Sequence, residues 1–294
     1  YWTDRDRDDY NGGLFWFTDH YLHAGTSTHR SYTEANRPPG QDYGGGPGPE
    51  HNFTAGLLLH HRLTGYARSG DAVVSLANWV IAMDGMESRW GPNGTATATS
   101  HPDYHGPGRG AGNSLNALLD AHDLTGDERY LRFAEVIVRR VIHPHDDIAA
   151  LDLLNAEKRW SYTMFLMALM RFAYRVEERE AWNDAYVYAH ACLLHYVRWM
   201  TVHERRYFDA VDELEFPTEA WPCQELRKAN VLSLASAFAP DDEEREKMRA
   251  RGRELAEGAW RDLFTFETRT QARALGIVMN EGLIAASGAE VIRR

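Results

Sequence analysis

The stretch that decides the fold is residues 52–65, NFTAGLLLHHRLTG, because residues 113–126, NSLNALLDAHDLTG, repeat its pattern. The two stretches are 61 residues apart, a spacing that accommodates two helices and two connections. In each, apolar residues recur at helical spacing and a glycine follows, as at the end of an α-helix. Asp71 or Asp127 then stands where an aspartate can start the next helix. The pattern predicts repeated pairs of helices.

The rest of the chain continues this organisation. Helical patterns cover residues 160–175, 182–202, 224–238, 241–264 and 270–286, and no stretch has a convincing strand pattern. The first helices of the pairs are rich in Gly, Ala and apolar residues nearly all round, which predicts burial on every side. A partner helix carries a charged stripe of Arg129, Arg132, Glu135, Arg139 and Arg140. We therefore predict an all-α fold, an (α/α)n toroid of helical hairpins. A six-pair ring needs twelve helices, so the ring is either incomplete or completed by residues 1–50.

The connections are unequal in length. Those after the second helix of a pair are long, at 85–110, 143–159 and 203–222, whereas those after the first helix are short. In a ring, all first helices run parallel, so the long connections emerge at one end. Long loops in a compact domain commonly carry function. We expect one domain over residues 1–294, with the loop-rich segment 1–49 contributing to that end.

Composition limits the partners. The chain has 44% hydrophobic and 26% charged residues and a net charge of −11, which argues against a nucleic-acid or anionic-membrane partner. No apolar run approaches the roughly 18 residues of a spanning helix. The polar start of the chain does not resemble a signal peptide, so we expect a soluble protein, either cytoplasmic or secreted after signal removal. Two cysteines do not make a disulfide framework. We predict that Cys192 is buried as a small apolar residue.

Polar and aromatic residues crowd into the long loops, and nine tryptophans and fourteen tyrosines suit a sugar-binding cleft. Two Gly/Pro-rich loops end at Asn52 and Asn113, which are also good helix N-caps. Helical histidines such as His122 read as structural residues. No zinc signature occurs, and we expect no metal and no cofactor. The predicted substrate-binding residues are His29, Arg30, His51, Asn52, Arg109, Asn113, Trp160, Tyr162 and Trp221.

Two chemistries use these residue types. A glycoside hydrolase needs two carboxyls, an acid and a base or nucleophile, roughly 5 to 9.5 Å apart. The carboxyl candidates are Asp19, Glu50, Asp103, Glu219 and Glu225, of which Glu50, Asp103 and Glu219 are our predicted catalytic residues. A polysaccharide lyase needs a neutral base and a group that holds the substrate carboxylate. Tyr104 and His105, with Arg109, are the candidates for that reaction.

At these residues the chain resembles the six-hairpin glycosidase superfamily. The resemblance rests on the helix–LTG–helix pairs, on the loops GGGPGPEHN at 44–52 and YHGPGRGAGN at 104–113, and on loops rich in Trp and Tyr. It covers residues 44–290 and implies an (α/α) toroid that acts on a carbohydrate, as a glycoside hydrolase or, in related toroids, a polysaccharide lyase. No catalytic motif matches residue by residue, so the resemblance assigns no catalytic pair. A non-catalytic helical domain that binds glycan or protein is the third interpretation.

Overall fold

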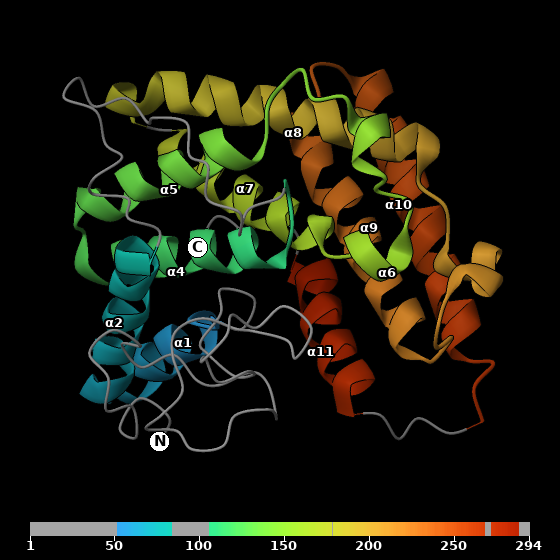
Figure 1. Cartoon of the computed structure of the whole chain (residues 1–294), viewed down its shortest axis with the longest axis horizontal. Coiled ribbons are helices and arrows are strands. Elements are labelled where there is room, and N and C mark those ends of the chain that lie inside the picture. Colours follow the sequence, from blue (N-terminus) through green and yellow to red (C-terminus); the bar gives the residue numbers. More distant parts are fainter. Residues whose placement is uncertain (1–51, 84–105, 178, 268–271, 288–294) are drawn as a thin grey trace, which may run out of the picture. The chain divides into compact units, whose positions relative to one another are not determined.

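The computed structural model describes residues 52–83, 106–177, 179–267 and 272–287 (Figure 1). Within these ranges the chain is all-α, as predicted, and has no strand. It divides into two compact units, each described by itself below. The first unit contains α1 (Ala55–Thr64), α2 (Ala67–Met83), α4 (Arg109–Thr125) and α5 (Glu128–Val141). The single domain, the toroidal closure and the role of residues 1–49 stay predictions.

The second unit comprises residues 106–108 and the chain from Ile142 onward. Its helices are η3 (Ile148–Leu151), α6 (Ala156–Arg159), α7 (Tyr162–Val176), η4 (Glu180–Trp182), α8 (Asn183–His203), η5 (Tyr207–Glu213), α9 (Ala220–Ala235), η6 (Ser236–Phe238), α10 (Asp242–Leu263) and α11 (Ala272–Ser287). The five long helical patterns of the sequence correspond to α7, α8, α9 with η6, α10 and α11.

The repeat in the first unit extends to individual hydrogen bonds. Gly65 and Gly126 adopt left-handed conformations with φ of 70° and 71°. The N–H of each glycine donates to the carbonyl oxygen four residues earlier at 2.8 Å. The hydroxyls of Thr64 and Thr125 likewise donate to carbonyl oxygens four residues earlier, at 2.6 and 2.7 Å. Both first helices therefore end in the same way, because glycine alone takes this conformation without strain.

The predicted helix starts are partly wrong. Thr54, not Asn52, precedes α1, and Asn113 lies inside α4, which begins at Arg109. The glycines at 110 and 112 are helical and buried, so tight packing outweighs their low helix propensity. Asp127 does precede α5 and accepts the N–H of Arg129 at 2.8 Å. Asp71 does not start a helix, since it lies within α2.

The predicted burial of the first helices holds for α4 but not for α1. Twelve of the residues of α4 are buried, on all sides of the helix. In α1 only Leu58 is buried, while the side chains of Leu59 and Leu63 are 58% and 76% exposed. The charged residues of α5 lie outside its buried face, as predicted.

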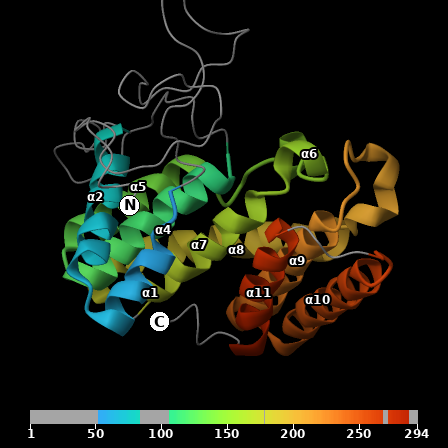
Figure 2. The ribbon, with the colours of Figure 1, turned by 90° about the horizontal axis from the view of Figure 1, so that it is seen from below.

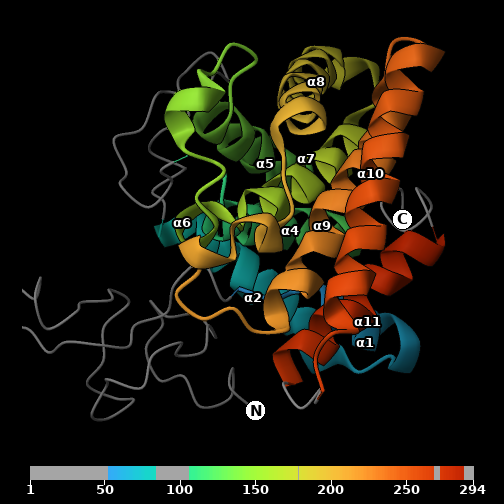
Figure 3. The ribbon, with the colours of Figure 1, turned by 90° about the vertical axis from the view of Figure 1, so that its right-hand side faces the viewer.

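In the second unit α9 is the central helix. It packs against α7, α8, α10 and α11, and Figures 2 and 3 show α10 and α11 beside it. Its approach to α10 is close because Gly252 has no side chain: a Cβ there would lie 2.8 Å from Ser233 Oγ and 3.1 Å from the carbonyl oxygen of Ala229. Cys223 lies in the first turn of α9, where Pro222 is tolerated. Cys192 is buried, as predicted, and both cysteines are free.

Candidate functional site

Two long connections of the second unit meet where α7 and α9 begin. Ala156, from the connection before α7, packs with Tyr207 and Leu214, from the connection before α9. The N–H of Glu215 also donates to Glu157 Oε1 at 2.8 Å, which joins the two connections directly. These two long connections therefore lie together, while the gathering of all long connections at one end of a ring stays a prediction.

The central helix α9 carries charged and polar residues into this region. Four of them are buried because α9 is surrounded by other helices: Gln224, Glu225, Lys228 and Asn230. Burying a charge is costly unless another group compensates it. The partners of these residues therefore determine what the region can do.

Lys228 is the centre of the buried charges. Its Nζ lies 2.7 Å from Glu204 Oε2 and 3.6 Å from Glu225 Oε1. It also donates to the carbonyl oxygen of Arg205 at 2.7 Å and lies 3.5 Å from the centre of the Tyr207 ring. Burial by itself would lower the pKa of Lys228, but Glu204 and the neighbouring groups outweigh it and raise this pKa. Lys228 is therefore a permanent cation.

Lys228 holds Glu225 less closely than it holds Glu204. The Oε2 of Glu225 accepts the N–H of Tyr207 at 2.8 Å, and its Oε1 lies 3.6 Å from Lys228 Nζ, against 2.7 Å for Glu204 Oε2. Burial raises the pKa of Glu225 from an ordinary value of 4.5 to about 7, despite the opposing effects of Lys228 and the Tyr207 N–H. Glu225 is thus a carboxyl that exchanges a proton near neutral pH.

Tyr162, which the sequence predicted to bind substrate, completes the cluster from α7. Its hydroxyl donates to Glu204 Oε1, and the side chain is fully buried. Burial and the nearby carboxylate of Glu204 raise the pKa of Tyr162 well above its ordinary value. This tyrosine orients Glu204 and does not lie open to a ligand in this structure.

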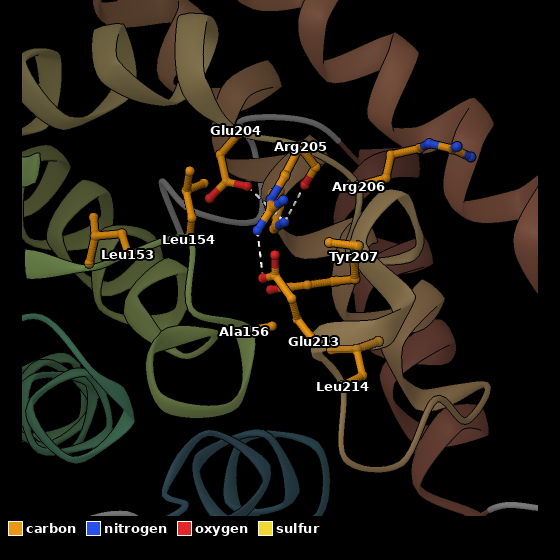
Figure 4. Close-up of a pocket in the computed structure, with 11 residues that line it drawn as sticks. Leu153, Leu154, Ala156, Glu204, Arg205, Arg206, Tyr207, Glu213 and Leu214 are labelled. Atoms are coloured by element: carbon orange, nitrogen blue, oxygen red, sulfur yellow. Dashed lines mark hydrogen bonds and ion pairs between the residues drawn. The ribbon is translucent and has the colours of Figure 1, made fainter.

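A cleft lies over the cluster, and Figure 4 shows Glu204, Arg205, Tyr207 and Glu213 around it. It encloses about 290 Å³ with its open mouth included. The side chains leave room for about one water molecule. The cleft as it stands is too small for a sugar ring. Its wall consists of Leu153, Leu154, Ala156, Glu204, Arg205, Arg206, Tyr207, Ala210, Glu213, Leu214 and Lys228.

The two tryptophans that the sequence predicts to bind substrate lie beside this cleft. Trp160 and Trp221 both pack against the cluster of Ala156, Tyr207 and Leu214. The Trp221 ring centre is 5.0 Å from that of Tyr207, and its Nε1 donates to a backbone carbonyl oxygen at 2.9 Å. The guanidinium carbons of Arg227 and Arg273 lie 5.8 and 5.7 Å from the centre of the Trp160 ring. Both tryptophan rings therefore lie at the edge of the cleft and also contact neighbouring side chains of the protein.

Other predicted site residues divide between the first unit and the undescribed parts of the chain. Glu219 is buried directly before α9 in the second unit. In the first unit, Asn52 and Asn113 are buried, and Arg109 is the first residue of α4. The Asn52 side chain donates to the Leu76 carbonyl oxygen at 3.5 Å. The residues outside the described ranges are His29, Arg30, Glu50, His51, Asp103, Tyr104 and His105.

The sequence did not indicate Glu204, Tyr207 or Lys228 as site residues. Lys228 stands three residues after Glu225, so the two share a helix face. Five of the seven residues from 224 to 230 are polar, between apolar stretches of a predicted helix, and this pattern was the available signal. Glu204 and Tyr207 gave none, because only the folded connection brings them to α9.

Comparison with known proteins yields no relative: no protein-family model, no curated protein and no solved structure matches the chain. In the described ranges no helix is both long and apolar enough to cross a membrane. Among the same residues, no three His, Cys, Asp or Glu side chains form a group that could hold a metal ion.

Proposed function

We propose that the protein is a carbohydrate-active enzyme, a glycoside hydrolase acting on an oligosaccharide or polysaccharide. The observation that supports this is the Glu225 carboxyl, whose burial raises its pKa to about 7. Hydrolysis of a glycosidic bond requires a carboxylic acid that still holds its proton near neutral pH. Glu225 lies where the long connections meet, beside Tyr207 and near Trp221, which supports its role as the proton donor.

The second carboxyl of the reaction is not Glu204. The carboxylates of Glu204 and Glu225 both contact the ammonium group of Lys228. Lys228 therefore occupies the space between the two carboxyls, where a substrate would have to bind. We assign the base or nucleophile to Glu219, which directly precedes α9, or to Glu50 or Asp103, which lie outside the described residues.

The lyase alternative has less support. Its base must lose a proton readily, whereas the pKa of Tyr162 is raised and its hydroxyl is a donor to Glu204. The lyase candidates Tyr104 and His105 lie outside the described residues.

One observation favours a non-catalytic domain as a second candidate. The charged cluster is enclosed, and the cleft above it holds about one water molecule. Such a network also occurs purely to hold helices together. On this interpretation Trp160 and Trp221 bind a glycan or a protein at the edge of the cleft, and no bond is cleaved.

An assay of released reducing ends, run together with the ultraviolet absorbance of unsaturated uronates, separates the candidates. Incubation with neutral and uronate-containing polysaccharides should release reducing ends alone. A rise in both signals indicates the lyase, and binding without either signal indicates the non-catalytic domain.

Site variants test the assignment in the same assay. Glu225→Gln should lower the rate at least tenfold, which corresponds to about 1.4 kcal/mol in the barrier. Glu219→Gln, Glu50→Gln and Tyr104→Phe test the remaining candidates. Glu257→Gln, on the exposed face of α10, is the control and should act like the original protein. Full activity of Glu225→Gln would exclude Glu225 as the proton donor.

A further inference from the structure

Three of the four residues that follow α8 are held to α9 through buried charged groups. Lys228 Nζ lies 2.7 Å from both the carboxylate of Glu204 and the carbonyl oxygen of Arg205. The N–H of Tyr207 donates to Glu225 Oε2 at 2.8 Å. The same connection continues through η5 and supplies most of the cleft wall (Figure 4). Any change that weakens these contacts therefore acts on the wall of the cleft.

The buried charges beneath this connection do not balance. Glu204 and Glu225 contribute two carboxyls, and Lys228 contributes one ammonium group. If both carboxyls are ionised, one negative charge has no counter-charge in a buried site, which is costly. The neighbouring arginines are already paired with other carboxylates: Arg205 with Glu213, Arg206 with Asp262, Arg227 with Glu281 and Arg251 with Glu254.

The geometry decides which carboxyl holds the extra proton. Glu204 receives the Tyr162 hydroxyl and lies 2.7 Å from the ammonium, so its negative charge is stabilised. Glu225 Oε1 is 3.6 Å from the ammonium, and its Oε2 receives the neutral backbone N–H of Tyr207. Four elements place charged or titratable groups against Glu225: Lys228 of α9, Tyr162 of α7, Glu204 directly after α8, and Arg206 and Tyr207 of the connection. Arg251 of α10 reaches the Glu204 carbonyl oxygen.

We propose that residues 204–214 form a lid that is shut while Glu225 carries a proton and opens when that proton is lost. Deprotonation places an uncompensated carboxylate beneath the connection. A carboxylate requires several water molecules. Glu225 does not line the cleft, which itself holds about one, so hydration of Glu225 requires residues 204–214 to move.

The lid also accounts for access to the site, and this step rests on the proposed function. In the open state Glu225 is hydrated and ionised, and the cleft can admit a sugar. Closure over the substrate removes water from the carboxyl, which then takes up a proton and becomes the acid that hydrolysis needs.

Hydrogen exchange of the full chain, followed by mass spectrometry at pH 5.5 and pH 8, tests the lid. After correction for intrinsic rates, amides of residues 204–214 should open more than tenfold as often at the higher pH, because only the closed state has the raised pKa. Glu225→Gln should abolish this pH dependence. Glu257→Gln, on the exposed face of α10, should retain it. Equal opening at both pH values, or unchanged pH dependence in Glu225→Gln, overturns the proposal.

A second measurement keeps the test independent of the variant's folding. In protein labelled with ¹³C at glutamate carboxyls, one carbon should titrate near pH 7 and the exchange of residues 204–214 should follow it. Absence of such a carbon overturns the proposal. Neither readout requires catalysis, so a working lid with no hydrolysis would contradict only the proposed function.

Discussion

Lys228 and Glu204 form an ion pair of 2.7 Å whose side chains are 3% and 1% exposed. Both charged groups are desolvated, and each is compensated by the charge of the other. Lys247 and Glu243 on α10 are as close, at 2.5 Å, but both are exposed to solvent. The two pairs therefore differ in environment rather than in length, and they should respond very differently to loss of the lysine.

Lys228→Met should lower the free energy of unfolding by about 3–5 kcal/mol, because it leaves buried carboxylates without a counter-charge. Lys247→Met removes the lysine of the exposed pair and should change little, since water solvates Glu243. Urea unfolding followed by circular dichroism measures both. Similar losses in the two variants would contradict the burial argument.

Glu225 should make stability fall with rising pH. Its pKa is about 7 in the folded protein and near 4.5 in an exposed state, so folding takes up a proton between these values. The contribution is fully present below pH 4.5 and is lost as the pH rises to 7, by up to roughly 1.4 kcal/mol per pH unit. The difference in unfolding free energy between the original protein and Glu225→Gln, taken from pH 5 to pH 8, isolates this group. A difference that stays constant with pH rules out the titration.

Gly252 and Gly276 should respond in opposite directions to the same substitution. A Cβ at Gly252 would meet Ser233 Oγ at 2.8 Å and a backbone oxygen at 3.1 Å, whereas nothing lies within 4 Å at Gly276. Gly252→Ala should therefore destabilise by about 1–2 kcal/mol through overpacking. Gly276→Ala should stabilise α11 by roughly 0.5–1 kcal/mol, since alanine is the better helix former. Thermal unfolding of the two variants shows the sign directly.

Gly126 is a further glycine that the backbone requires. Its φ of 71° strains any residue with a Cβ, although nothing would clash with that atom. Gly126→Ala should cost about 1 kcal/mol, and Gly126→Asn less, because asparagine tolerates this conformation. Equal stability of all three proteins in urea would show that the strain is relieved by movement of the connection.

The sequence predicted features that depend on neighbours along the chain. It placed α10 over 241–264, and Asp241 does cap this helix by accepting the Glu244 N–H at 2.8 Å. It also placed Trp160 and Trp221 in one region. It could not find Glu204 as a partner of Lys228, because residues 24 positions apart meet only through the path of the connection. The exposure of α1 was missed for a related reason, since apolar composition shows that a helix can be buried, not that a partner covers it.

The contact between Arg62 and Asp123 has a consequence for how such a chain can grow. The Arg62 guanidinium donates to the Asp123 carbonyl oxygen at 3.2 Å, and Asp123 stands 61 residues later, at the position equivalent to Arg62. A residue that binds the equivalent position of the next repeat makes a head-to-tail contact. In such a contact the first hairpin contributes one surface, and the second hairpin carries an equivalent surface with which a further hairpin could pack. Duplication of one hairpin therefore supplies its own docking surface, and the number of hairpins can change without the invention of a new interface.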